Sequence, residues 1–272
     1  MDFYTTDELI AWKPPQIQWI IKPLLPVAGK MMVFGLPKSW KSMLSYHTGF
    51  TISKGLPWFG FKTSKQAVAL AQFEIGQAMV RERIAKYQAH ANGSPGHDFR
   101  IATSLRFKMN TQYGFRELDQ DIARLVPRPM LVILDPMYRC FAGNIADPKE
   151  ISGFLDNIDT LIAKYNTAFI IIHHNRKTQN SNEGPIDRGA EEALGSSYIG
   201  NWVDSALSLR PKTLGSSEIV MRFELLRHAE EELHPMTIVF ERATLQPRII
   251  EQFRQAELEG FTNKDVSIRG LT

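Results

Sequence analysis

Disulfides and membrane-spanning runs are both missing from this sequence. Its 272 residues contain one cysteine, Cys140, which excludes an intramolecular disulfide and any metal site built from several cysteines. No apolar run approaches the roughly 18 residues of a transmembrane helix. The first residues also lack the basic region and apolar core of a signal peptide. We therefore expect a reducing, cytoplasmic setting and no membrane partner.

Strong charge of either sign is missing as well. The chain has 32 Lys and Arg against 29 Asp and Glu, for a net charge of +3. This balance neither requires nor excludes a nucleic-acid partner, so any basic binding surface must be local. The length and the 43% hydrophobic composition suit one α/β domain with small additions, or two small domains.

Apolar runs of strand length alternate with helical patterns along the chain. Continuous apolar runs predict buried strands at residues 67–73, 130–134 and 168–172. Amphipathic spacing predicts helices at residues 77–89, 114–125 and 148–165. This alternation indicates an α/β fold with a mostly parallel twisted sheet and helices on both faces. Later strands joined by short turns predict an antiparallel extension at the C-terminal side, at residues 204–209, 219–225, 236–240 and 248–250.

The stretch from Lys30 to Ser42 has the strand–loop–helix layout of a phosphate-binding P-loop, G-x-x-x-x-G-K-[ST]. Backbone N–H groups of the loop and of the helix start would face the phosphates. Lys41 would reach the β- and γ-phosphates, and Ser42 would place its hydroxyl on a magnesium ion. An ordinary strand-to-helix turn with a solvated lysine is the alternative. The residues predicted to bind nucleotide are Gly35, Leu36, Pro37, Lys38, Ser39, Trp40, Lys41, Ser42 and Met43.

Trp40 replaces the second glycine of that motif. We expect the loop to accept this bulky residue only if its backbone is already near-helical and its indole points away from the phosphates. Pro37 also removes one N–H group from the loop.

Polar side chains end three other predicted strands. Asp135 follows an apolar strand, where a P-loop ATPase holds magnesium directly or through water. Glu74 could orient and deprotonate an attacking water, and one of His173 and His174 could sense the γ-phosphate. Taken singly, they could be an Asp-Pro turn, a helix N-terminal acid and a structural histidine pair. Together at one sheet edge they favour ATP hydrolysis.

These motifs, in this order, resemble RecA-type ATPases, in particular the RepA-like group of hexameric replicative helicase ATPases of plasmids, phages and related mobile elements. The resemblance covers roughly residues 15 to 250. It rests on the P-loop, on the strands that end at Glu74, at Asp135-Pro136 and at His173-His174-Asn175, and on Gly195-Ser196-Ser197 leading to Trp202-Val203-Asp204. It implies a lead-in segment (1–27), a RecA-like ATPase domain (28–252) and a C-terminal tail (253–272).

The resemblance also implies residue roles. Glu74 corresponds to the catalytic glutamate, Asp135 to the Walker B aspartate, and His174, or less favourably His173, to the switch residue. Arg83 corresponds to an arginine against the adenine, with a solvated helix arginine as the alternative. Arg227 resembles an arginine finger that reaches a neighbouring subunit's site, with Arg222 as the alternative.

The loops after Asp135 and His174 occupy places where this family contacts single-stranded DNA. Arg176, Lys177 and Arg188 suit phosphate contacts there, although nearby acidic residues leave an ordinary solvated loop as the alternative. The resemblance thus implies an ATP- and Mg²⁺-dependent homohexameric ring on single-stranded DNA, a replicative helicase. A recombinase-like or regulatory ATPase without unwinding, and a nucleotide-binding module with weak hydrolysis, remain the alternatives.

Overall fold

The computed structural model describes residues 2–91, 93–145, 147–174, 197–213 and 215–252. Within them, one large sheet has the strand order β11-β10-β9-β8-β3-β7-β6-β4-β5. Its parallel strands are β3 (Lys30–Gly35), β4 (Val68–Gln72), β5 (Phe99–Thr103), β6 (Leu131–Asp135), β7 (Ala168–His174) and β8 (Ser205–Pro211). The antiparallel strands are β9 (Glu218–Leu226), β10 (Met236–Phe240) and β11 (Pro247–Gln252). The prediction of a mostly parallel sheet with an antiparallel C-terminal extension is confirmed.

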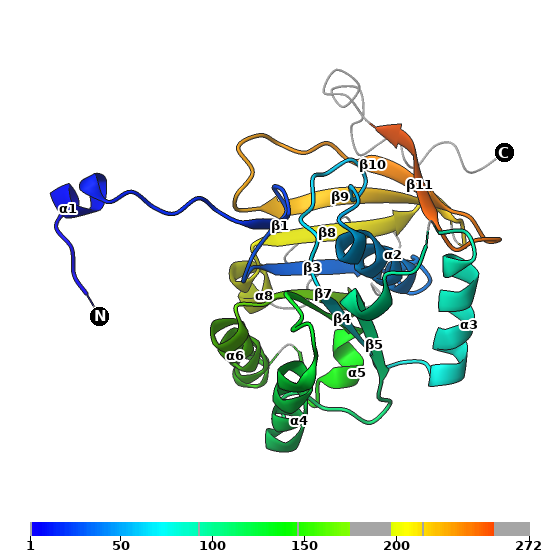
Figure 1. Ribbon diagram of the computed structural model, residues 1–272, viewed down its shortest axis with the longest axis horizontal. Helices are drawn as coiled ribbons and strands as arrows, with labels where there is room; N and C mark the ends of the chain where they lie inside the picture. Colours follow the sequence, from blue (N-terminus) through cyan, green and yellow to red (C-terminus); the bar gives the residue numbers. More distant parts are fainter. Residues whose placement is uncertain (1, 92, 146, 175–196, 214, 253–272) are drawn as a thin grey trace, which may run out of the picture.

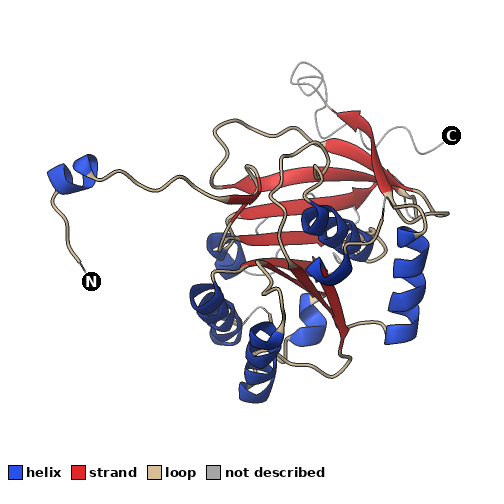
Figure 2. Cartoon of the chain, in the orientation of Figure 1, coloured by secondary structure: helices blue, strands red, loops and turns tan. Residues whose placement is uncertain are grey.

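The central strands are buried on both faces, which is why their apolar runs are continuous rather than alternating. Met31 and Val33 of β3 face one hydrophobic cluster, and Met32 and Phe34 face the other. The helices therefore cover both faces of the sheet (Figure 2), as the sequence predicts.

Different helices build the two clusters. The first contains α2 (Lys41–Lys54), the end of α3 (Gln77–Gln88), and a small hairpin of β1 (Trp19–Ile21) and β2 (Leu25–Pro26). The second contains α4 (Gln112–Arg124), α5 (Met137–Cys140), α6 (Pro148–Tyr165) and α8 (Ser197–Trp202). A short 3₁₀ turn, η1 (Gly96–Asp98), leads into β5.

Helix α6 shows how sequence signals set an element. Asp147 caps its start by accepting the backbone N–H groups of Lys149 and Glu150, and Asn166 ends it in the left-handed conformation. Its buried residues recur at helical spacing and pack into the second cluster. The predicted bounds for this helix are those observed.

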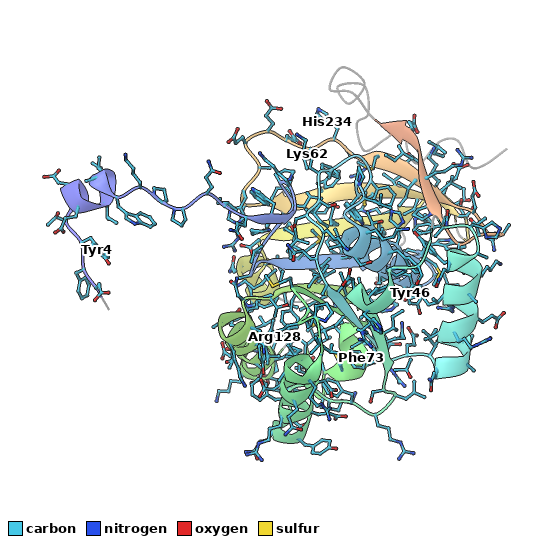
Figure 3. The ribbon with its side chains drawn as sticks, in the orientation of Figure 1. Tyr4, Tyr46, Lys62, Phe73, Arg128 and His234 are labelled. Carbon is cyan, nitrogen blue, oxygen red and sulfur yellow. The ribbon has the colours of Figure 1, made fainter. Side chains whose placement is uncertain are left out.

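The N-terminal segment lies apart from the sheet. Residues 2–18 are exposed, and α1 (Thr6–Ala11) is held by a capping box between Thr5 and Glu8. This segment projects from the body of the molecule, and Tyr4 lies far out on it (Figures 1 and 3). None of the described helices has the length and apolar character needed to cross a membrane.

The parallel strands deliver their carboxyl ends to one edge of the sheet. Gly35 of β3 lies beside His174 of β7, and Gln72 of β4 lies beside Asp135 of β6. This register brings together the polar strand ends named above, which is the usual place for a ligand in such a sheet.

Candidate nucleotide site

The loop between β3 and α2 closes on its own lysine. The Lys41 ammonium group donates to the carbonyl oxygens of Gly35 at 2.8 Å and Leu36 at 2.6 Å, and to the Ser39 hydroxyl at 3.0 Å. Burial lowers the pKa of Lys41 to about 8, although Asp135 and Glu74 act in the opposite direction. A Cβ atom on Gly35 would lie 2.4 Å from the Leu209 carbonyl oxygen, so only glycine fits where the strand ends.

Trp40 departs from the sequence-based expectation. Its backbone is left-handed, with φ 62° and ψ 15°, so the expected near-helical backbone is wrong. The indole points out of the loop, as expected: it stacks on Phe240 with centroids 5.2 Å apart and planes 7° apart, and Nε1 donates to the Ser216 carbonyl at 3.1 Å. The left-handed backbone costs about 1–2 kcal/mol, and the aromatic pair, at about 0.5–1.5 kcal/mol, offsets much of it.

Asp135 is fully buried at the end of β6. Ser42 Oγ donates to its Oδ1 at 3.2 Å, and Gln72 Nε2 donates to its Oδ2 at 3.3 Å. Burial raises the pKa of Asp135 to about 6, against the hydrogen bond from Ser42. A buried carboxylate beside a hydroxyl is a hard oxygen pair of the kind that Mg²⁺ prefers.

That pair fits magnesium only as part of a larger shell. In the part of the chain that the structure describes, no group of three or more His, Cys, Asp or Glu side chains could hold a metal ion. Mg²⁺ commonly keeps several waters and takes phosphate oxygens with one or two carboxylates. Ser42 and Asp135 therefore fit an ion that arrives with a nucleotide.

Glu74 lies exposed at the carboxyl end of β4 and is held by a tyrosine. The Tyr138 hydroxyl donates to Glu74 Oε1 at 2.9 Å. The same tyrosine ring meets the His174 ring edge-on, with centroids 5.1 Å apart. Burial and the nearby Lys41 lower the pKa of His174 to about 4, so this imidazole is neutral at physiological pH.

His174 rather than His173 joins this group. The two histidines are adjacent on β7 and point to opposite faces, with His173 buried beside Phe34 and His174 beside Gly35. His174 is thereby brought to Tyr138 and within electrostatic range of Glu74 and Lys41.

Arg83 lies near the site but not against the P-loop. It is half-buried on α3. Burial raises the pKa of Tyr46 to about 12, Asp135 raises it further, and Arg83 lowers it. Tyr46 lies one turn after Ser42 on α2 and is labelled in Figure 3. Arg83 is therefore close to the P-loop helix, and its contact with an adenine stays a prediction.

Arg227 is not brought to the site of its own chain. It follows β9, where its backbone N–H donates to the Asp204 carbonyl and its exposed guanidinium to the Asn201 carbonyl. Arg222 lies farther along β9, beside Ser208 of β8. The predicted DNA-binding residues Arg176, Lys177 and Arg188 lie outside the described residues.

Two residues of the site were missed by the sequence reasoning. Gln72 is buried, and while Nε2 binds Asp135, its Oε1 accepts the backbone N–H of Glu74 at 2.7 Å. Tyr138 is the second, through its bond to Glu74. The available signals were a lone polar residue in an apolar strand and an aromatic hydroxyl three residues after Asp135.

Gln72→Leu should lower the free energy of unfolding by about 1–3 kcal/mol. Leucine fills similar space but leaves one Asp135 oxygen and the Glu74 N–H without their partners. Urea unfolding followed by circular dichroism measures the change. Gln88→Leu at the end of α3 is the matched control, and an equal loss in both variants would contradict a special role for Gln72.

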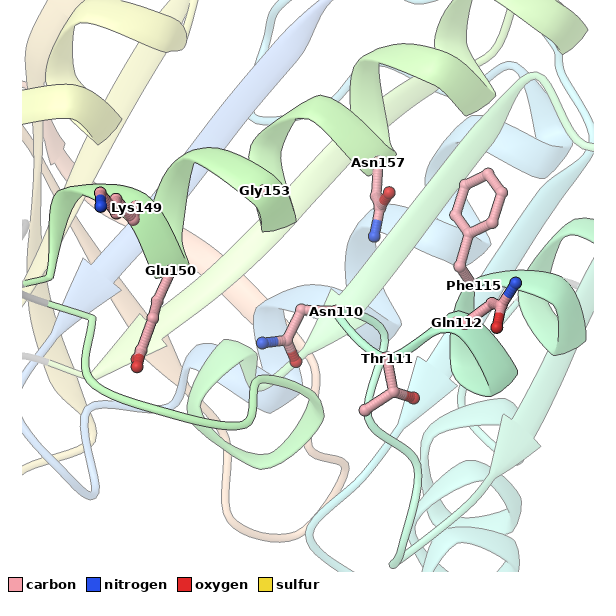
Figure 4. A pocket seen from close by; sticks show the side chains of 8 residues that line it. All are labelled: Asn110, Thr111, Gln112, Phe115, Lys149, Glu150, Gly153 and Asn157. Carbon is pink, nitrogen blue, oxygen red and sulfur yellow. The ribbon is translucent and has the colours of Figure 1, made fainter.

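A hollow of about 480 Å³ lies elsewhere, between the start of α4 and α6 (Figure 4). Its lining residues are Asn110, Thr111, Gln112, Phe115, Lys149, Glu150, Gly153 and Asn157. None of them belongs to the nucleotide site, so this hollow is separate from the chemistry described above.

Known proteins resemble this chain in sequence over its N-terminal part and in fold over most of its length. The family described as AAA domain matches residues 2–180. The solved ATPase domain of a helicase is similar with a TM-score of 0.61 and 10% identity, covering 82% of this chain and 85% of that one. A RadB recombinase structure has a TM-score of 0.55 and 18% identity, covering 80% and 89%. No curated protein matches the chain significantly.

Proposed function

The chain belongs to the AAA domain family and is a RecA-type P-loop ATPase, and from that premise we propose that it hydrolyses ATP as a homohexameric ring on single-stranded DNA. In this proposal it is the motor of a replicative DNA helicase. The order of its motifs along the chain and the fold that it shares with the helicase ATPase domain support this.

One observation carries the ATPase part of the proposal. Lys41, Ser42, Glu74, Asp135 and His174 come from four different strand ends or their helices, and all lie at one edge of the sheet. Hydrogen bonds, ring contacts and electrostatic interactions link these residues to one another, some through Gln72 and Tyr138. An ordinary strand-to-helix turn would not need this grouping.

The proposed mechanism assigns each group one task. Lys41 leaves the loop carbonyls and pairs with the β- and γ-phosphates, whose charge holds it protonated. Glu74 turns from the Tyr138 hydroxyl to a water and accepts its proton as the water attacks the γ-phosphorus. Neutral His174 donates a hydrogen bond to the γ-phosphate and so reports its presence to the chain that follows β7.

Magnesium enters this mechanism as a bound partner of the nucleotide. Ser42 and Asp135 would hold it, because their oxygen atoms already lie 3.2 Å apart. When bound it would neutralise charge on the β- and γ-phosphate oxygens. Its proximity would also favour the ionised form of Asp135, which burial disfavours.

Lys41→Ala tests the nucleotide site. We expect Mg-dependent ATP turnover to fall by about 100-fold or more, because a charged donor to the transferring phosphate is lost. Phosphate release measures turnover, and binding of a fluorescent ADP analogue measures affinity. Lys54→Ala, at the far end of the same helix, is the matched control and should behave as the unaltered protein. Unchanged turnover in Lys41→Ala would refute the assignment.

The ring and the DNA partner need separate tests. We expect single-stranded DNA to stimulate turnover and the assembled species to have the mass of a hexamer in the presence of ATP. Arg176, Lys177 and Arg188 are the proposed phosphate contacts, whose loss would weaken binding uniformly across sequences. Failure of single-stranded DNA to bind at low salt would remove the helicase part of the proposal.

A recombinase-like or regulatory ATPase is the competing interpretation of the same fold, which a RadB recombinase also has. Strand displacement on a forked duplex would favour the helicase, and filaments on single-stranded DNA without displacement would favour the recombinase. Tight nucleotide binding without phosphate release would instead favour a nucleotide-binding module.

A further inference from the structure

We propose that Phe240 and Arg242, in the C-terminal antiparallel extension, are positioning residues for the P-loop and act through Trp40. The inference rests on the proposed nucleotide site, since it concerns how that site is held in shape. It assigns to the extension a task that the second glycine performs in the usual motif.

The P-loop and the extension meet at the same edge of the sheet. β10 runs parallel to β3, with β9 and β8 between them, so Phe240 at the carboxyl end of β10 lies at the edge where Gly35 ends β3. Figure 1 shows the extension as the upper strands of the sheet. The Trp40 side chain therefore reaches across the ends of β8 and β9 to meet β10.

The contacts come from two separate parts of the extension. One face of the indole lies flat on Phe240, which is fully buried. Nε1 donates to the carbonyl of Ser216, in the turn between β8 and β9. The Arg242 guanidinium lies 5.8 Å from the indole centroid and also donates to the Gly215 carbonyl of that turn at 2.9 Å. Strand and turn are thus tied together around one side chain.

This arrangement matters because Trp40 sets the start of α2. Its left-handed backbone directs the following N–H groups, those of Lys41 and Ser42, toward the side of the loop where phosphates are expected. Glycine adopts that conformation without strain, whereas tryptophan must be held in it. The stack on Phe240 and the hydrogen bond to Ser216 hold it before any nucleotide arrives.

The extension lies outside residues 2–180, the part of the chain that the AAA domain family matches. The unusual residue lies inside the matched part, and the residues that hold it lie outside. A substitution in the extension should therefore change nucleotide affinity without touching the nucleotide.

Phe240→Leu tests the inference against Phe154→Leu. Both phenylalanines are fully buried, but Phe154 lies on α6 in the opposite cluster. We expect Phe240→Leu to weaken binding of a fluorescent ADP analogue about tenfold, equivalent to about 1.4 kcal/mol. The KM for ATP should rise while kcat changes little, because the loop is preorganised less but the chemistry is the same. Phe154→Leu should bind as the unaltered protein does.

Trp40→Gly restores the usual motif and makes the sharpest comparison. We expect it also to bind the analogue more weakly, and Phe240→Leu should add nothing in the Trp40→Gly background, since the two residues act as one unit. Equal or tighter binding in Trp40→Gly would overturn the inference. So would equal effects of Phe240→Leu and Phe154→Leu.

Arg242→Gln keeps the test open if a core variant folds poorly. Arg242 is exposed, so its replacement should leave the fold intact, and we expect about two- to fivefold weaker binding. Arg248→Gln, on the exposed side of β11, is its control. If Lys41→Ala loses binding while Arg242→Gln and Phe240→Leu do not, the positioning role fails and the nucleotide site stands. If Lys41→Ala binds normally, the nucleotide site itself fails.

Discussion

Arg227→Ala is expected to form complete rings that hydrolyse ATP about 1,000-fold more slowly or worse, the usual effect of losing an arginine finger. The expectation follows from where the residue lies. Arg227 is beside the start of β8, whereas the P-loop is beside Leu209, near the other end of that strand. Four strand residues separate these two levels, about 13 Å. Arg227 therefore cannot serve its own nucleotide and is placed to serve a neighbour's.

A mixing experiment tests this directly. Arg227→Ala subunits keep an intact P-loop, and Lys41→Ala subunits keep an intact Arg227. Each variant alone should be inactive, but mixed rings should regain part of the phosphate release, because some interfaces then combine both intact parts. Arg248→Ala, an exposed arginine on β11, should be active alone and is the control.

Two outcomes would contradict the assignment. Normal turnover of Arg227→Ala in assembled rings would show that the finger is elsewhere, and Arg222→Ala should then carry the loss. Inactive mixtures from two variants that assemble together would show that both residues act within the same subunit's site.

The fold could be predicted because its signals are local and redundant. The apolar runs that form β4, β6 and β7 are continuous because those strands are buried inside the sheet, and amphipathic helices separate them along the chain. Such patterns indicate parallel strands and deliver their carboxyl ends to one edge. Lys41, Glu74, Asp135 and His174 were predicted to lie together for that reason.

The contacts between these residues could not be predicted, because they depend on register and distant packing. Gln72 lies beside Asp135 only because β4 and β6 align one particular way. Trp40 meets Phe240, 200 residues later, through strands whose order no local pattern gives. The backbone of Trp40 was wrongly predicted because its environment, rather than its local sequence, stabilises the left-handed conformation.

Glu74→Gln is expected to slow hydrolysis by about 100- to 10,000-fold, the range for a lost general base, while nucleotide binding persists. Glutamine has the shape of glutamate, and its carbonyl oxygen can still accept the Tyr138 hydroxyl that now holds Glu74 at 2.9 Å. The variant therefore removes the proton acceptor and keeps the geometry. Single-turnover phosphate release and retention of bound ATP are the two measurements.

The pairing of these measurements separates chemistry from binding. Lys41→Ala should lose affinity and turnover together, whereas Glu74→Gln should lose turnover and accumulate the ATP-bound state. Glu82→Gln, on the exposed side of α3, should change neither. Normal turnover in Glu74→Gln would exclude this carboxylate as the base. Asp135 could not replace it in that role, because it is fully buried and its oxygens are already engaged by Ser42 and Gln72, so an acceptor outside the described residues would then be required.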